Sequence, residues 1–274
     1  ALSSAASDVY KRQLLYRGYD IYQLVEGGKG KRFIFEEGAY LLLFGELPND
    51  EQLKEFQKAL SGCMEFPTNF TRDVIMKAPT ADIMSSMTRS ILTLGSYDNE
   101  KDNLDISNVL RQSMQLISTF PMMAVYGYHA YNHYEKYGSM YIHRPDKELS
   151  IAENFLRLLR PDMQYSELEA KVLDVALLLH MEHGGGNNST FTTRVVTSSG
   201  SDTYSVIAAA MSSLKGKKHG GANLMVMNMM DDIKNHISDY HDEEEIESYL
   251  RKILNKETFD KKGLIYGMGH AVYS

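Results

Sequence analysis

The sequence contains almost no cysteine: Cys63 is the single cysteine among 274 residues. One thiol cannot form an intrachain disulfide or a cysteine-rich zinc site. This composition is typical of a reducing compartment, so we expect a cytoplasmic protein. The neighbours Leu60 and Met64 indicate that Cys63 is a packing residue rather than a nucleophile.

Long apolar runs and an excess of positive charge are also missing. The longest apolar run, residues 39–44, is far shorter than the roughly 20 residues that a membrane-spanning helix needs. Acidic residues outnumber basic ones by 36 to 29, which gives a net charge of −7. We therefore expect neither a nucleic-acid partner nor a membrane. The length suits one large globular domain or two smaller ones.

The two ends of the sequence look unlike the rest. Residues 1–13 read ALSSAASDVYKRQ, which lacks the apolar core of an export signal and has its basic residues at the wrong end. The segment resembles a translated sequencing adaptor, and we expect it to be disordered and outside the fold. At the other end the chain stops at Ser274, just after a Gly-Met-Gly-His turn and without a closing helix. We expect both ends to be cut.

Apolar residues recur at helical spacing along most of the remaining chain, which predicts an all-α fold with two lobes. Asn49 and Gln52 form a capping-box pattern at a helix start, and Gly45 is a stop signal. Strand signals are confined to residues 16–21 and 140–143. The expected helices are residues 36–44, 49–60, 80–95, 106–119, 122–136, 151–159, 166–180, 202–214, 225–236 and 243–254.

The helix at residues 166–180 has the clearest pattern. Leu168, Val172, Val175 and Leu179 form one apolar stripe, which predicts a face turned toward the core. His183 projects closer to this stripe than His180 does, so we expect His183 to point inward where the helix ends.

Three segments place a histidine beside glycine: HMEHGGGNNSTF at 180–191, KKHGGANLM at 217–225 and YGMGHAVYS at 266–274. Glycine permits unusual turns and lets a ligand approach the main chain closely. His219 directly precedes an apolar helical stretch, where a neutral imidazole can donate a hydrogen bond to a carbonyl and stabilise an enolate. His270 follows Gly267 and Gly269, whose backbone amides suit a phosphate or thioester group.

Other motif readings fit less well. His180 and His183 could suggest a metal-dependent hydrolase, but their spacing matches neither zinc-protease helix motif. The segment GGKGKR at 27–32 lacks the spacing of a phosphate-binding loop and is expected to be a hairpin or loop. Ser189 has no GxSxG elbow around it, which argues against a serine hydrolase. We expect no metal site.

Long segments of the sequence closely resemble the citrate synthase family. They are YRGYDIYQL at 16–24, FEEGAYLLLFGELP at 35–48, the stretch from 180 to 223, and GMGHAVY at 267–273. The resemblance implies a helical, two-domain homodimer that condenses acetyl-CoA with oxaloacetate in the cleft between the domains. It implies a large domain over 14–219 and the start of a small domain over 220–274. No cofactor is expected beyond the coenzyme A thioester, which is a substrate.

The resemblance also implies residue roles. His183 would bind oxaloacetate, with Asn187 beside it. His219 would hydrogen-bond the acetyl carbonyl as the enol forms, and Ser189 would orient His219. His270 would polarise the ketone of oxaloacetate, and the main chain of Gly267, Met268 and Gly269 would contact coenzyme A.

The sequence departs from the family pattern in two ways. Gly184 stands where many relatives have glutamate. More seriously, the family's catalytic aspartate and carboxylate-binding arginines lie beyond the last turn and are absent from this sequence, so we expect no citrate formation by the chain alone. The open alternatives are a 2-methylcitrate synthase that uses propionyl-CoA, a histidine-based metal-binding hydrolase, and a non-catalytic helical scaffold.

Overall fold

The computed structural model describes residues 7–8, 13–182 and 186–268 of the chain. It divides into two compact units, Ala1–Ser213 and Leu214–Ser274. The large and small domains expected over 14–219 and 220–274 remain a prediction about the family architecture. No helix in the described ranges is long and apolar enough to cross a membrane.

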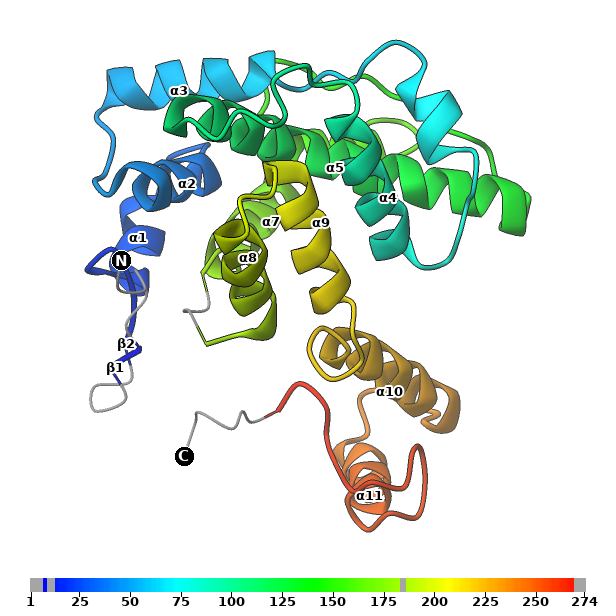
Figure 1. Ribbon diagram of the computed structural model, residues 1–274. Coiled ribbons are helices and arrows are strands. Elements are labelled where there is room, and N and C mark those ends of the chain that lie inside the picture. Colours follow the sequence, from blue (N-terminus) through cyan, green and yellow to red (C-terminus); the bar gives the residue numbers. More distant parts are fainter. Residues whose placement is uncertain (1–6, 9–12, 183–185, 269–274) are drawn as a thin grey trace. The chain divides into compact units, whose positions relative to one another are not determined.

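The structure is mostly helical, as the sequence predicts (Figure 1). In the first unit the elements are β1 (Ser7–Asp8), β2 (Gln13–Tyr16), β3 (Tyr19–Asp20), α1 (Ile21–Gly27), α2 (Ile34–Phe44), α3 (Asp50–Gly62), the π-helical turn η1 (Thr71–Ile75), α4 (Ile83–Gly95), α5 (Ile106–Lys136), α6 (Ile151–Leu159), α7 (Glu167–Leu179), α8 (Asn188–Ser198) and α9 (Thr203–Leu214), whose last residue opens the second unit. The second unit continues with α10 (Ala222–His236) and α11 (Glu243–Leu254).

The short strands pair in the antiparallel order β1-β2-β3. Ser7 lies opposite Leu14, and Tyr16 lies opposite Tyr19. Ser7, Asp8 and Gln13 therefore lie in paired strands, which differs from the disorder expected for residues 1–13. The other residues of 1–12 lie outside the described part of the chain.

The main core of the first unit lies between α3, η1, α4, α5, α6 and α9. Its most fully buried apolar side chains are Leu60, Phe70, Ile75, Ile91, Leu94, Met123, Leu158 and Tyr204. A smaller cluster joins Tyr16, Ile21, Leu24, Ile34, Leu41 and Leu178. This second cluster ties the start of the chain to α2 and α7.

Local sequence signals set several helix ends as expected. Asn49 accepts a hydrogen bond from the Gln52 amide, and the Gln52 side chain accepts one from the Asn49 amide, which completes the capping box of α3. Gly45 ends α2 with φ of 90°, a left-handed conformation that favours glycine. Asp202 caps α9 through the amide and hydroxyl of Ser205.

The helix break expected at Pro121 is wrong. Residues 106–119 and 122–136 belong to one 31-residue helix, α5, with Pro121 inside it. Proline removes a single backbone donor, and buried side chains on both sides, including Leu116, Met122 and Met123, hold the helix in the core. Packing therefore outweighs the local cost of the proline.

Two further expectations need correction. Leu168, Val172 and Leu179 are 71%, 61% and 43% exposed, so three of the four residues of the expected stripe of α7 do not face the core. Val175, the fourth, is partly buried and packs against the second cluster. The buried face of α7 instead carries Ala170, Asp174 and Leu178. Residues 140–143 form no strand; the hydroxyl of Tyr126 donates to the carbonyl of His143 in this segment.

The second unit has a small core of its own. Met229, Ile237, Tyr249 and Ile253 are buried where α10 packs against α11. The Tyr249 hydroxyl donates a 2.6 Å hydrogen bond to a carboxylate oxygen of Asp232, which joins the two helices.

Candidate functional site

The first histidine–glycine segment starts from an anchored helix end. Tyr16 is fully buried, and its hydroxyl donates a 2.8 Å hydrogen bond to the carbonyl of Leu178 in the last turn of α7. The same hydroxyl oxygen accepts a 3.4 Å hydrogen bond from the amide of Glu182. Burial raises the pKa of Tyr16, so the phenol remains protonated and can act as this donor. Strand β2 therefore holds the chain immediately before His183.

Helix α7 is also fixed against the start of α2. The buried carboxylate of Asp174 accepts hydrogen bonds from the amides of Ile34 and Phe35, at 3.1 and 3.0 Å. A Cβ added at Gly38 would lie 2.4 Å from Leu178 Cδ1, so the two helices pack too closely for a side chain at this point. Sequence reasoning missed Asp174, although a carboxylate within an apolar helix was a usable signal.

Residues 183–185 lie outside the described part of the chain. After them, the side chain of Asn187 caps the start of α8. Asn187 Oδ1 accepts hydrogen bonds from the Thr190 amide at 2.9 Å and from the Ser189 hydroxyl at 2.8 Å. Asn187 and Ser189, two of the expected substrate residues, are thus joined directly. His183 lies outside the described residues.

The second segment forms a compact turn that leads into α10. The amides of His219 and Gly220 both donate to the carbonyl of Gly216, at 2.9 and 3.0 Å. A Cβ at Gly220 would lie 2.0 Å from the carbonyl oxygen of Leu214. The glycine is therefore needed for a close backbone approach, as we expected, and His219 is held just before the positive end of α10.

The third segment meets the same helix. Gly267 has φ of +86°, and a Cβ there would lie 3.1 Å from Val226 Cγ2 on α10. The histidine–glycine segments at 217–225 and 266–274 therefore both adjoin the first turns of α10. Met268 is 76% exposed beside Gly267. Gly269 and His270 lie outside the described residues.

The expected residues fall into the two units separately. Asn187 and Ser189 belong to the first unit, whereas His219, Gly267 and Met268 belong to the second. In the described part of the chain, no three His, Cys, Asp or Glu side chains gather in a group that could hold a metal ion. His180, which the metal alternative would use, has its Nδ1 2.6 Å from the carbonyl oxygen of Ala176 on its own helix.

Comparison with known proteins agrees with these features. The family model described as citrate synthase, C-terminal domain, matches residues 1–274. The citrate synthase of Heyndrickxia coagulans is 31% identical over 97% of this chain and 65% of its own length. The 2-methylcitrate synthase of Shewanella oneidensis is 34% identical over 95% of this chain and 62% of its own length. The chain thus spans less than two thirds of the length of each of these two relatives.

A solved structure extends the likeness to the fold. The citrate synthase of Thermoplasma acidophilum, solved as a ternary complex with carboxymethyl coenzyme A and oxaloacetate, superposes with a TM-score of 0.80 at 22% identity. The match covers 99% of this chain and 65% of that one. By the family model and the relatives together, this chain belongs to the citrate synthase family.

Proposed function

We propose that this chain supplies the histidine turns of an enzyme that condenses acetyl-CoA with oxaloacetate to give citrate and coenzyme A. The observation that carries the proposal is the meeting of the His219 turn and the Gly267 turn at the start of α10. Together they place an imidazole and a stretch of exposed main chain at one helix end. A thioester carbonyl and its carrier need those two kinds of group.

In the proposed reaction His219 donates a hydrogen bond to the thioester carbonyl while a base removes a methyl proton. The donor stabilises the negative charge that develops on the carbonyl oxygen, and the resulting enol attacks the ketone carbon of oxaloacetate. Hydrolysis of the citryl thioester then releases citrate and coenzyme A. His183 and Asn187 bind oxaloacetate, Ser189 orients His219, and His270 polarises the ketone. Gly267, Met268 and Gly269 contact coenzyme A.

The base and the arginines for the substrate carboxylates are expected outside this sequence. We accordingly propose that the chain alone is inactive and that turnover needs the further length that its relatives have. We also propose a cytoplasmic homodimer without a cofactor; the single cysteine supports the reducing compartment. The ligands named for the Thermoplasma acidophilum complex support the substrate pair.

A second candidate is 2-methylcitrate synthesis from propionyl-CoA, which the Shewanella oneidensis relative supports. The two candidates are separated by joining this chain to the remaining C-terminal part of the Heyndrickxia coagulans enzyme and following coenzyme A release with either thioester. We expect the higher kcat/KM with acetyl-CoA. A strong preference for propionyl-CoA would favour the second candidate, and no release with either, from a folded chimera, would contradict both.

A further inference from the structure

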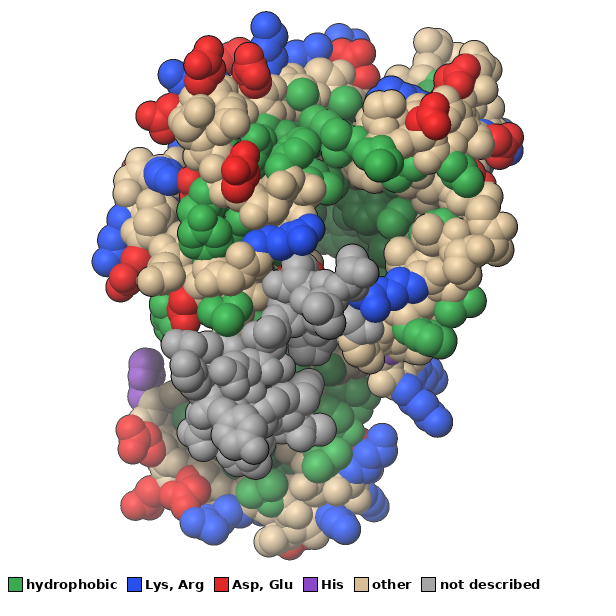
Figure 2. Space-filling view, turned by 60° about the vertical axis from the view of Figure 1, so that its left-hand side comes forward, with side chains coloured by type: hydrophobic (Ala, Val, Ile, Leu, Met, Phe, Trp, Pro, Cys, Tyr) green, Lys and Arg blue, Asp and Glu red, His purple; other side chains and the backbone are tan. Residues whose placement is uncertain are grey.

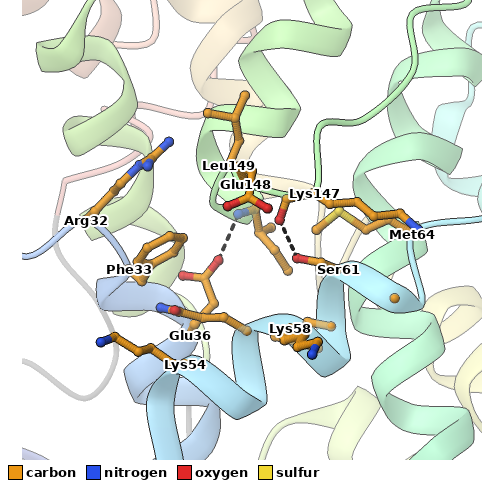
Figure 3. Close-up of a pocket in the computed structure, with 14 residues that line it drawn as sticks. Arg32, Phe33, Glu36, Lys54, Lys58, Ser61, Met64, Lys147, Glu148 and Leu149 are labelled. Carbon is orange, nitrogen blue, oxygen red and sulfur yellow. Dashed lines mark hydrogen bonds between the residues drawn. The ribbon is translucent and has the colours of Figure 1, made fainter. Parts of the chain in front are cut away.

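The first unit contains a cavity of about 590 Å³ between α2, α3 and the segment that leads into α6 (Figure 3). Its size lies within the roughly 300–1,000 Å³ typical of small-molecule sites. None of the residues that line it belongs to the expected active site. The cavity therefore needs an explanation of its own.

One face of α3 forms a polar wall of this cavity. Lys54, Gln57, Lys58 and Ser61 all line it, and their spacing of three and four residues puts them on the same side of the helix. The Ser61 hydroxyl is already used, because it donates a 2.8 Å hydrogen bond to the carbonyl of Lys147. Lys54 and Lys58 form no ion pair with any residue in the described ranges.

The balance of charge around the cavity is positive. Arg32 and Lys147 line it in addition to the two lysines of α3, against the acidic residues Glu36 and Glu148. Arg32 and Lys147 are partly neutralised by ion pairs with acidic residues that do not line the cavity, at 2.9 and 3.1 Å. Among the described residues that line the cavity, Lys54 and Lys58 have no ion pair and neither does the carboxylate of Glu148, so two lysines stand against one exposed carboxylate.

The inner wall carries two buried polar atoms without a partner. Glu36 is only 2% exposed; its Oε1 accepts a 2.8 Å hydrogen bond from the Ile151 amide, whereas its Oε2 has no partner among the described residues. Gln57 Nε2 is likewise buried and unpartnered. A buried polar group without a partner destabilises the folded state by about 1–3 kcal/mol. A ligand that formed hydrogen bonds with both atoms would remove this penalty.

Both unpartnered atoms can act as donors. Burial, reinforced by the charge of Asp174, raises the pKa of Glu36 to about 8. The carboxyl is therefore largely protonated at neutral pH, and Oε2 can carry the proton. Gln57 Nε2 is an amide donor by its chemistry. Figure 3 shows the Glu36 carboxyl between α3 and the segment of Lys147, Glu148 and Leu149.

We propose that this cavity binds a small organic anion, with its carboxylate or phosphate oxygens accepting from Glu36, Gln57, Lys54 and Lys58. Leu60, Met64 and Ile151 add apolar surface to the lining, so the ligand has an apolar body beside its anionic group. The site is a second binding site of the chain and does not depend on the proposed condensation.

Isothermal titration of the 274-residue chain tests this with two probes, trimesate for the carboxylate class and 1-naphthyl phosphate for the phosphate class. We expect saturable binding of one of them, weaker binding of inorganic phosphate, and a loss of affinity of about tenfold or more in the Lys54→Gln, Lys58→Gln double variant. The matched control is Lys77→Gln with Lys171→Gln, two exposed lysines outside the cavity, which should leave the affinity unchanged.

Gln57→Leu separates a built site from loose attraction to lysines, because it removes a donor without changing the charge. We expect it to weaken binding about tenfold as well. The class of the probe that binds identifies the anionic group. Absence of saturable binding for both probes overturns the proposal. Equal effects of the cavity and control lysine variants, or full affinity in Gln57→Leu, also overturn it.

Discussion

The hydroxyl of Tyr16 donates a 2.8 Å hydrogen bond to the carbonyl of Leu178, across 162 residues of sequence. This bond joins strand β2 to the last turn of α7, directly before the segment of the expected substrate histidine. Tyr16 and Leu178 are both buried, so no water replaces the bond when it is lost.

Tyr16→Phe should therefore lower the free energy of unfolding by about 1–2 kcal/mol, the cost of a buried hydrogen bond and of a carbonyl left without its donor. Urea denaturation followed by circular dichroism measures this change. Tyr19→Phe is the matched control, because Tyr19 is 37% exposed, and it should change stability by less than about 0.5 kcal/mol. Equal stability of the Tyr16 variant and the parent chain would contradict the anchoring role.

Glu36 should make stability depend on pH. Its folded pKa of about 8 lies above its usual value of 4.5, so between these values the folded state holds a proton that the unfolded chain has released. The free energy of unfolding consequently falls as the pH rises through this window. Burial raises the pKa of Asp174 only to about 6. The pH dependence of stability between about pH 6 and about pH 8 is therefore due to Glu36.

Glu36→Gln should flatten the fall in stability between about pH 6 and about pH 8, where each unit of pKa shift corresponds to about 1.4 kcal/mol. Urea denaturation at both pH values gives the slope. Glu148→Gln, at an exposed position of the same cavity, should keep the slope of the parent chain. An unchanged slope in the Glu36 variant would show that its carboxyl is ionised in the folded state.

Gly267→Ala should destabilise the second unit by about 1–2 kcal/mol. The positive φ of Gly267 disfavours any side chain, and the added Cβ would press on Val226. Thermal melting measures the loss, and Gly27→Ala is the control because a Cβ at Gly27 meets nothing within 4 Å. An unchanged melting temperature for Gly267→Ala would mean that the turn does not pack on α10 as described.

Exposed apolar residues should make the chain associate in solution. Leu168 and Val172 on α7, and Phe191 and Val195 on α8, are at least half exposed, and hydrophobic side chains reach the drawn face at several places (Figure 2). Exposed apolar surface of this kind drives association. Sedimentation velocity should show irregular oligomers or poor solubility.

The double variant Leu168→Lys, Val172→Lys should shift the chain toward the monomer. Asn99→Lys with Asn235→Lys adds the same charge at exposed polar positions and should not. A parent chain that sediments as a clean monomer would refute the prediction, as would equal effects of the two double variants.

Local signals predicted most of the fold, and tertiary contacts account for what they missed. The capping pair Asn49 and Gln52 and the stop at Gly45 act within one turn of backbone, so the sequence reveals them. Pro121 is tolerated because of core packing from several helices, which no local pattern shows. The stripe of Leu168 and Val172 has the right spacing for a helix, but the spacing does not say which partner covers it.

The candidate site divides in the same way. Gly220 and Gly267 were recognisable because a close backbone approach requires a residue without a Cβ. Glu36, Asp174 and Tyr16 were missed because their roles come from burial and from partners more than 100 residues away. An acidic residue inside an apolar helix was the signal in the sequence that pointed to Glu36 and Asp174.

The central claim is that His219 stabilises the enolate of the thioester. It is tested most directly by His219→Ala in the chimera of this chain with the remaining part of the Heyndrickxia coagulans enzyme, with His241→Ala, an exposed histidine of the same unit, as the control. Steady-state coenzyme A release from acetyl-CoA and oxaloacetate should show kcat lowered by roughly two to three orders of magnitude in His219→Ala and unchanged in His241→Ala. A His219→Ala chimera with the turnover of its parent would contradict the account.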